Sequence, residues 1–317
     1  MPAFSVTKGF WTSPHAERTL PRDFDRRTLL MGIVNATPDS FSDGGECVAP
    51  DAARSRATAL VAAGADIIDL GAESTRPGSA RVDESEELRR LLPALAAVRE
   101  ALPQTPISVD TYRARVAAAA IEAGADIIND VHAIGPADGS GAGIAPGGGV
   151  PAEEFARESV YEIGLVAAQL GAPLIAMHNR ATPNYANFER DFFDDLRRGI
   201  EKILACGVPE NQLWLDPGFG FGKTPAQNLR LVADLARVAD FGFPLLLGTS
   251  RKSTLGIVLD GKPPKERVGG DAACSALGAF HGAACLRLHD VAVHRDTVRV
   301  ADAIFSVKFR GNETLRA

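Results

Sequence analysis

The sequence of 317 residues is poor in cysteine and has no long run of uncharged apolar residues. Its four cysteines show no CxxC spacing, so we expect reduced thiols in a cytoplasmic protein rather than a zinc site or a disulfide framework. A membrane-spanning helix needs about 18 or more apolar residues in a row, and we therefore expect no membrane span. The N-terminal segment lacks the apolar region of a secretory signal, so none is expected.

Neither sign of charge dominates the sequence. Lys and Arg number 34 and Asp and Glu number 40, which gives a formal net charge of −6. This mildly acidic balance argues against a nucleic-acid partner, whereas a small anionic ligand needs only a few local cations. Hydrophobic residues make up 45% and charged residues 23%, values that are typical of a globular protein and exclude a disordered chain.

Eight short apolar runs alternate with longer segments rich in Ala, Leu and Arg. Each run is apolar on both faces, as is typical of parallel strands covered by helices. The predicted strands are 29–34, 66–71, 106–110, 126–131, 173–178, 212–216, 244–249 and 285–290. The predicted helices include 52–63, 84–102, 112–123, 196–206, 225–239 and 269–282, and the charged run 84–90 is expected to be a solvated face.

A near-repeat indicates how these segments combine. The sequence AGADIID at 63–69 recurs as AGADIIN at 123–129, and in both a glycine ends a helix directly before a strand. Eight βα units fit an α/β fold of the (β/α)8 TIM barrel type, which has about 250 residues. We therefore expect one barrel domain over 29–317 and a short N-terminal extension over 1–28. An open doubly wound sheet is the alternative, although it would not need eight units.

The glycine-rich stretch 135–150 follows the fourth predicted strand. It holds seven glycines and two prolines, which predicts a loop without regular structure. Because loops after barrel strands surround the functional site, this stretch is either a tolerated insertion or a mobile rim.

Polar side chains follow all eight predicted strands, at the end where a barrel builds its functional sites. Carboxylates such as Asp110 and Asp216 match the N–H edge of a planar heterocycle, whereas Arg and His suit phosphate. An Asn oxygen can bind Mg²⁺ that is shared with phosphate. The pattern predicts a ligand with a polar heterocycle and an anionic tail. The candidate cations are Arg76, Lys223, Arg251, Lys252, Arg287 and His289.

The segment GFGFGKT at 218–224 only superficially resembles a phosphate-binding P-loop. That motif places four residues between its first glycine and the Gly-Lys pair. The required first position is occupied here by Pro217. We therefore do not interpret this segment as a nucleotide site.

Seven segments together resemble the dihydropteroate synthase family of pterin-binding barrels. They are residues 32–45, 64–79, 107–112, 124–131, 215–224, 248–253 and 287–291. The resemblance implies a transferase of folate biosynthesis and a target of sulfonamides. The implied reaction condenses 6-hydroxymethyl-7,8-dihydropterin pyrophosphate with p-aminobenzoate to give 7,8-dihydropteroate and pyrophosphate. It also implies Mg²⁺ as cofactor, a homodimer in the cytoplasm, and small-molecule substrates rather than nucleic acid or membrane as partners.

The resemblance also implies a role for particular residues, and it makes Asp110, Asp216, Lys252 and Arg76 catalytic. The implied pterin contacts are Thr75, Asp110, Asn129, Met177, Asp216 and Lys252. The implied pyrophosphate contacts are Asn35, Arg76, Arg287 and His289, with Asn35 also holding the metal. The implied p-aminobenzoate contacts are Thr75, Pro77, Phe221, Lys252 and Ser253. Loops 36–45 and 74–80 would be the mobile loops that close over the site, with Phe41 and Ser42 contributing there.

Some positions depart from the family pattern, and alternatives remain open. The departures are ThrTyrArg at 111–113, HisAsnArg at 178–180 and the stretch 135–150. Asp110 and Asp216 could instead cap helices, and His289 could be a core histidine. A pterin-binding methyltransferase of the corrinoid type would share the pterin acids but should lack ThrArgProGly and SerArgLysSer. A silent pterin-binding homologue would bind the pterin without turnover.

Overall fold

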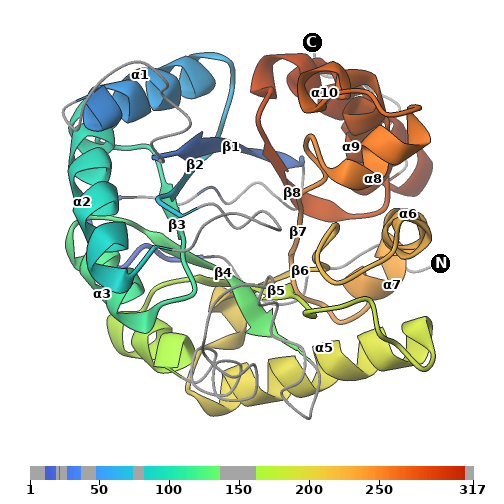
Figure 1. Ribbon diagram of the computed structural model, residues 1–317, viewed down its shortest axis with the longest axis horizontal. Helices are drawn as coiled ribbons and strands as arrows, with labels where there is room; N and C mark the ends of the chain where they lie inside the picture. The colour runs from blue at the N-terminus through green and yellow to red at the C-terminus, as the bar shows by residue number, and fades with distance from the viewer. Residues whose placement is uncertain are drawn as a thin grey trace.

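The computed structural model describes residues 11–18, 21, 27–36, 48–73, 82–135 and 162–310. Its sheet is a closed barrel in which eight parallel strands follow one another in chain order (Figure 1). The strands are β1 (Leu29–Asn35), β2 (Ile67–Gly71), β3 (Ile107–Asp110), β4 (Ile127–Ile134), β5 (Leu174–His178), β6 (Leu213–Asp216), β7 (Leu245–Leu247) and β8 (Ala283–Leu288). All eight predicted strands and the predicted fold class are confirmed.

Helices surround the barrel on the outside (Figure 1). They are α1 (Val48–Ala62), α2 (Glu84–Ala101), α3 (Ala114–Glu122), α5 (Phe188–Ala205), α6 (Pro225–Ala233), α7 (Leu235–Ala239), α8 (Ser253–Val258), α9 (Val268–Phe280) and α10 (Val291–Arg310), and residues 162–170 are also helical. The helix predicted at 196–206 begins earlier, because Asn187 caps it by accepting the N–H of Arg190. The segment predicted as one helix at 225–239 divides at Asp234.

The near-repeat has the local structure that the sequence predicts. Gly64 and Gly124 have φ angles of 108° and 106°, values that residues with a side chain rarely adopt. Each glycine therefore reverses the chain after a helix, and the following strand begins three residues later. This geometry brings β2 and β4 into the barrel in the same way and puts Asp69 and Asn129 at equivalent positions.

The hydrophobic core has two layers. Inside the barrel, Met31, Ile127, Ile175 and Trp214 fill the half nearest the amino ends of the strands. A larger layer lies between the strands and the surrounding helices. The apolar filling leaves the carboxyl ends of the strands as the polar half of the barrel interior.

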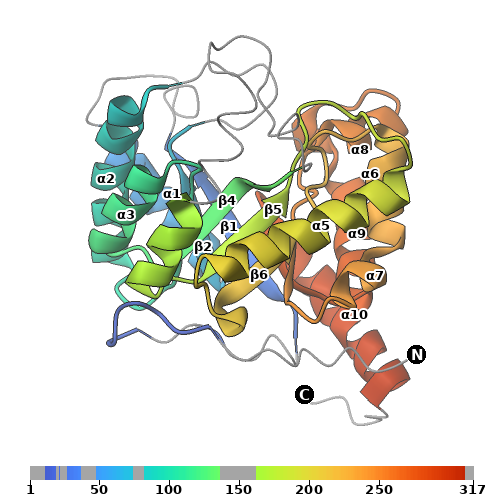
Figure 2. The same cartoon turned by 90° about the horizontal axis from the view of Figure 1, so that it is seen from below.

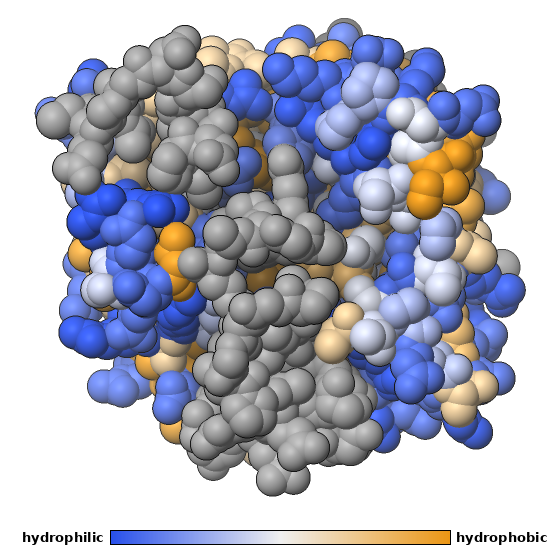
Figure 3. Space-filling model, in the orientation of Figure 1, coloured by the Kyte–Doolittle hydropathy of each residue, from blue (hydrophilic) through white to orange (hydrophobic). Residues whose placement is uncertain are grey.

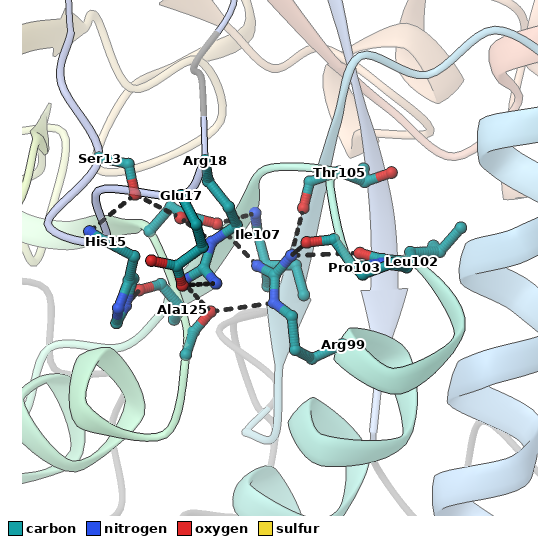
Figure 4. Close-up of polar contacts among 12 residues, drawn as sticks. Ser13, His15, Glu17, Arg18, Arg99, Leu102, Pro103, Thr105, Ile107 and Ala125 are labelled. Atoms are coloured by element: carbon teal, nitrogen blue, oxygen red, sulfur yellow. Dashed lines mark hydrogen bonds and ion pairs between the residues drawn. The ribbon is translucent and has the colours of Figure 1, made fainter.

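The described part of the N-terminal extension lies across the amino end of the barrel (Figure 2). Trp11 is fully buried and stacks on Trp214, with 3.7 Å between ring centroids. The buried carboxylate of Asp126 binds Arg18 and Arg99, each at 2.7 Å. Figure 4 shows the side chains of these two arginines. Residues 11–18 therefore cover the amino end of the barrel. The domain boundary at residue 28 stays a prediction.

Among the described residues, no helix combines the length and apolar character needed to cross a membrane.

Candidate active site

The closed parallel barrel brings the predicted strand-end residues to one end of the molecule. Asp110 ends β3 and Asp216 ends β6. Asn129 of β4 pairs with Asp110, and Met177 of β5 pairs with Asp216, so both lie at the same level of the barrel. Carboxyl ends of parallel strands lie on the same face of a barrel, and both acids feel the charges of Lys252 and Arg287. The expectation that the two carboxylates share one end is therefore confirmed.

Arg287 joins two carboxylates inside this end of the barrel. Its Nε donates to Asp69 at 2.6 Å, and its terminal nitrogen donates to Asp110 at 2.7 Å. Asn129 Nδ2 lies 3.3 Å from the same Asp69 carboxylate. The sequence assigned Asp110 to the heterocycle and Arg287 to the anionic tail, and the structure shows the two side chains in direct contact.

Asp69 is the residue that the sequence analysis missed. It is fully buried and accepts hydrogen bonds from Arg287 and Asn129. The near-repeat contained the signal, because AGADIID and AGADIIN align Asp69 with Asn129, which was identified. Asp69 fixes the directions of both partners and so belongs to the site.

Two of the predicted pterin contacts have a buried acceptor atom with no hydrogen-bond partner among the described residues. They are Asp110 and Asn129, each through its Oδ1. Buried polar atoms in native proteins are almost always hydrogen-bonded. Two buried acceptors that no described residue contacts therefore indicate a binding site for a ligand with N–H donors. Asp216 uses Oδ1 to accept the N–H of Gly218 at 2.7 Å, which leaves its second oxygen for a ligand.

Burial controls the protonation of these groups. Burial raises the pKa of Asp110 to about 7, although the nearby Arg287 opposes the rise. It also raises the pKa of Asp216, and it lowers the pKa of Lys252 to about 8. Burial therefore brings the pKa of one carboxyl group and of one amine close to neutral pH, as is common at functional sites.

Lys252 reaches from the start of α8 to the loop after β6. Its Nζ donates to the backbone oxygen of Phe219 and lies 4.4 Å from the centre of the Phe221 ring. Ser253 is exposed at the first turn of α8. Lys252 and Phe221, which the resemblance placed together, are therefore neighbours.

Lys223 does not belong with the ligand-binding cations. Its Nζ is buried, lies 2.9 Å from Nδ1 of His178, and donates to the backbone oxygens of Gly218 and Phe221 at 3.0 and 2.9 Å. Burial holds its pKa well below the usual value of lysine. The lysine instead fastens the loop after β6 to the end of β5.

Tyr112 and Arg113, which depart from the family pattern, hold the side chain of Glu73, an acidic residue just after β2. The Tyr112 hydroxyl donates to Glu73 at 3.0 Å, and Arg113 binds Glu73 at 2.5 Å and also contacts Glu87. The expectation of a solvated face at 84–90 is wrong for Glu87, which is 1% exposed because Arg113 neutralises it.

The alternative roles of three residues can be judged from the structure. The residues that cap α3 and α6 are Arg113 and Thr224, so neither Asp110 nor Asp216 is a helix cap. His289 is half-buried beside Ser250, with 3.1 Å between Nδ1 and Oγ, and is not enclosed in the core. The predicted residues Phe41, Ser42, Thr75, Arg76 and Pro77, the loops 36–45 and 74–80 apart from Ala36, and residues 136–150 lie outside the described residues.

Comparison with known proteins identifies relatives along most of the chain. Residues 31–289 match the family described as pterin binding enzyme. Dihydropteroate synthase of Clostridium beijerinckii is 40% identical, with 88% of this chain and 94% of the relative aligned. Dihydropteroate synthase of Synechocystis is 42% identical, with 89% and 92% aligned. Named relatives of this kind favour the synthase over the methyltransferase alternative.

Solved structures agree with this relationship. A dihydropteroate synthase from Clostridium difficile, determined in the presence of pteroic acid, is 39% identical with a TM-score of 0.79, and the match covers 90% of this chain and 99% of that one. The Xanthomonas albilineans dihydropteroate synthase with 4-aminobenzoic acid is 36% identical with a TM-score of 0.77, covering 92% and 98%. This chain therefore belongs to the pterin-binding enzyme family and, within it, to the dihydropteroate synthases.

Proposed function

We propose that the polar end of the barrel condenses 6-hydroxymethyl-7,8-dihydropterin pyrophosphate with p-aminobenzoate to give 7,8-dihydropteroate and pyrophosphate. The chain is a transferase of folate biosynthesis, as its relatives are. The observation that carries the site assignment is the pair of buried oxygens on Asp110 and Asn129 that no described residue contacts, together with Asp216 near the same cations, Lys252 and Arg287. They match a flat heterocycle that offers several N–H donors along one edge.

The pterin ring occupies the end of the barrel between β3 and β6 in this proposal. Asp110, Asn129 and Asp216 accept its N–H groups, Met177 packs on the ring, and Lys252 lies beside it. Thr75 is a further predicted contact. Pyrophosphate leaves before the amine attacks, and the carboxylates stabilise the positive charge that develops on the pterin methylene group. No covalent protein nucleophile is needed.

The pyrophosphate group lies toward β8. Arg287 has five N–H donors and uses two for Asp69 and Asp110, so three remain for phosphate oxygens. His289 and the predicted contact Arg76 complete this side. The amine substrate lies near Phe221, Lys252 and Ser253, with Thr75 and Pro77 as predicted contacts. A Yersinia pestis relative was solved with a pterine-sulfa conjugate, which supports competition between sulfonamides and p-aminobenzoate.

Asn35 fits a metal that is shared with the substrate. It is half-buried at the carboxyl end of β1, paired with Gly71 of β2. The described residues contain no group of three or more His, Cys, Asp or Glu that could hold a metal alone. Mg²⁺ accepts one protein oxygen when phosphate and water supply the other ligands. Bound there, Mg²⁺ would neutralise charge on the leaving pyrophosphate.

A homodimer in the cytoplasm is the proposed state of the chain. Several large apolar side chains on α9 and α10 are exposed, which supports burial against a second copy. They are Leu277, Val293, Val300, Ile304 and Val307. A further apolar patch lies over α8 (Figure 3) and includes Ile257 and Val258. The described free cysteines Cys206, Cys274 and Cys285 are buried and agree with a reducing compartment.

The direct test is product formation from both substrates by the purified protein. We expect dihydropteroate, separated by chromatography, only when both substrates and Mg²⁺ are present. Chelation of the metal should stop turnover, and excess Mg²⁺ should restore it. Tight pterin binding without product under these conditions would overturn the proposal in favour of the silent homologue.

A further inference from the structure

In the segment Ser250–Lys252, between β7 and α8, Arg251 lies between Lys252 of the proposed site and Ser250, which contacts His289 of that site. Lys252 donates to the backbone oxygen of Phe219 on the pterin side. Ser250 Oγ accepts the backbone N–H of His289 at 3.2 Å on the pyrophosphate side. Arg251, which the sequence grouped with the candidate cations, binds neither side and turns toward α10.

The backbone of Arg251 is held in an unfavourable conformation. Its φ angle of 60° lies in the left-handed region, where residues other than glycine are strained. Its N–H donates to the buried carboxylate of Asp271 at 3.3 Å, and its carbonyl accepts Arg267 at 2.8 Å. Asp271 is itself fixed by the Thr249 hydroxyl at 2.8 Å. The surroundings therefore impose this conformation on the segment.

The guanidinium of Arg251 binds Asp290 through two parallel hydrogen bonds. Nε donates to one carboxylate oxygen at 3.0 Å, and the terminal nitrogen donates to the other at 2.7 Å. A two-bond pair of this kind fixes orientation as well as distance. Asp290 follows His289 directly, so the segments after β7 and β8 are joined twice, by Ser250 with His289 and by Arg251 with Asp290.

We propose that Arg251 is a positioning residue which, through Asp290, keeps Lys252 and His289 at a fixed spacing. This inference rests on the proposed function, because one substrate has to reach both side chains at once, with its ring at Lys252 and its phosphates at His289. A small shift of one segment against the other would separate the ring contact from the leaving-group contact. Arg251 itself touches no substrate.

The test uses four variants of the full-length chain and one control variant. Arg251→Gly removes the ion pair and tolerates the positive φ, Arg251→Lys keeps the charge without the two-bond geometry, and Asp290→Asn removes the partner charge. Arg251→Gly/Asp290→Asn measures coupling. The matched control, Arg115→Ala, removes an exposed pair with Glu84. Each protein is assayed for kcat, for KM of both substrates, for inhibition by pyrophosphate and for its unfolding midpoint.

We expect Arg251→Gly to unfold near the wild-type midpoint, because glycine relieves the strain. Its kcat/KM for the pterin substrate should fall about 10- to 100-fold, the loss expected from misplaced groups. Asp290→Asn should lose a similar factor, the double variant should lose no more, and Arg251→Lys should recover part of the activity. Inhibition by pyrophosphate should weaken, and Arg115→Ala should match the wild type.

Kinetic constants of Arg251→Gly and Asp290→Asn within about twofold of the wild type would overturn the inference. If Arg251→Gly does not fold, Arg251→Lys and Asp290→Asn decide the question by the same constants. If the wild type makes no dihydropteroate, the proposed function fails by itself. The positioning role is then judged by calorimetry of pyrophosphate, which should bind more weakly to Arg251→Gly than to the wild type; equal binding would contradict it.

Discussion

At the residue scale, the buried acids at the carboxyl end of the barrel have different surroundings. Asp110 faces Arg287, whereas Asp130 is fully buried and accepts the backbone N–H of His132 at 2.8 Å. Burial raises the pKa of Asp130 to about 7. The second oxygen of Asp130 has no hydrogen-bond partner among the described residues, so the neutral acid is favoured.

Replacing Asp130 should therefore change how stability depends on pH. A raised pKa in the folded state means that the contribution of the acid is present at low pH and is lost as pH rises through about 7. Asp130→Asn keeps an oxygen for the His132 N–H but cannot ionise. Its free energy of unfolding relative to the wild type should rise by about 1.4 kcal/mol per pH unit between the ordinary pKa of aspartic acid, about 3.9, and the raised value of about 7, and should level off at higher pH.

Urea unfolding at several pH values between acid and mildly alkaline conditions measures this effect. Asp260→Asn, at an exposed turn, is the matched control and should give a difference that does not vary with pH. A pH-independent difference for Asp130→Asn as well would show that Asp130 is already ionised in the folded protein.

At this scale, some site residues could be predicted from the sequence and others could not. Asp110, Asn129 and Asp216 could be identified because each lies at or close to the end of a predicted strand within a family motif. The contact between Asp69 and Arg287 could not, because it joins residues 218 positions apart and depends on how the barrel closes. Lys223 was wrongly grouped with the ligand-binding cations, because its motif does not reveal that the side chain points inward to His178.

At the scale of elements, the loop after β6 depends on a glycine at position 218. Gly218 has a φ of 70°, and a Cβ there would lie 1.8 Å from the carbonyl oxygen of His178. Lys223 donates to the carbonyl of Gly218, and the same loop presents Phe221 to Lys252. The loop therefore packs directly against β5 while it shapes one wall of the proposed amine site.

Substituting this glycine should damage stability and substrate binding together. Gly218→Ala combines strain of about 1–3 kcal/mol from the positive φ with a clash of similar cost. Gly261→Ala is the control, because its φ is 86° but no atom lies within 4 Å of a Cβ. We expect Gly218→Ala to lose clearly more unfolding free energy and to raise the KM for p-aminobenzoate. Equal losses in the two variants would contradict the close packing.

The order and type of elements were predictable, whereas several boundaries were not. Parallel strands are apolar on both faces, so the runs at 29–34 and 173–178 were evident. The start of α5 at Phe188 was missed because its first turns are rich in charge and its cap, Asn187, does not stand out from the loop before it. The short α8 gives too few residues to show a helical period.

At the scale of the whole molecule, the barrel separates a structural end from a chemical end. The N-terminal segment lies at the amino end of the barrel, opposite the carboxyl ends of the strands (Figure 2), and its Trp11 packs on Trp214 inside the barrel. Trp11→Ala should lower the free energy of unfolding by about 3–5 kcal/mol. The kcat of the folded fraction should stay near the wild-type value, because Trp11 packs on Trp214 at the amino end and the described site residues lie at the carboxyl end.

Chemical denaturation and steady-state kinetics on the same preparations test this separation. Trp11→Phe retains an aromatic ring over Trp214 and should recover most of the stability. A loss of kcat at unchanged stability would show that the amino end of the barrel affects catalysis.

The proposed homodimer makes a separate prediction for the outer surface. Ile304 is 54% exposed on α10, and a carboxylate there would be buried without a partner in a dimer. Ile304→Asp should therefore shift the mass measured by size-exclusion chromatography with light scattering toward the monomer. Glu122→Lys, at the end of α3 across the barrel, should leave the mass unchanged. A wild-type mass of one chain would contradict the dimer.

The most direct test of the account is calorimetric titration of the pterin substrate into the wild type, Asp110→Asn and Asp216→Asn. If carboxylates from β3 and β6 hold one ring, each variant should lose about 1.5–3 kcal/mol of binding free energy, as expected for a hydrogen bond to a charged group. Wild-type affinity in either variant would contradict the account, because that carboxylate would then lie outside the pterin site.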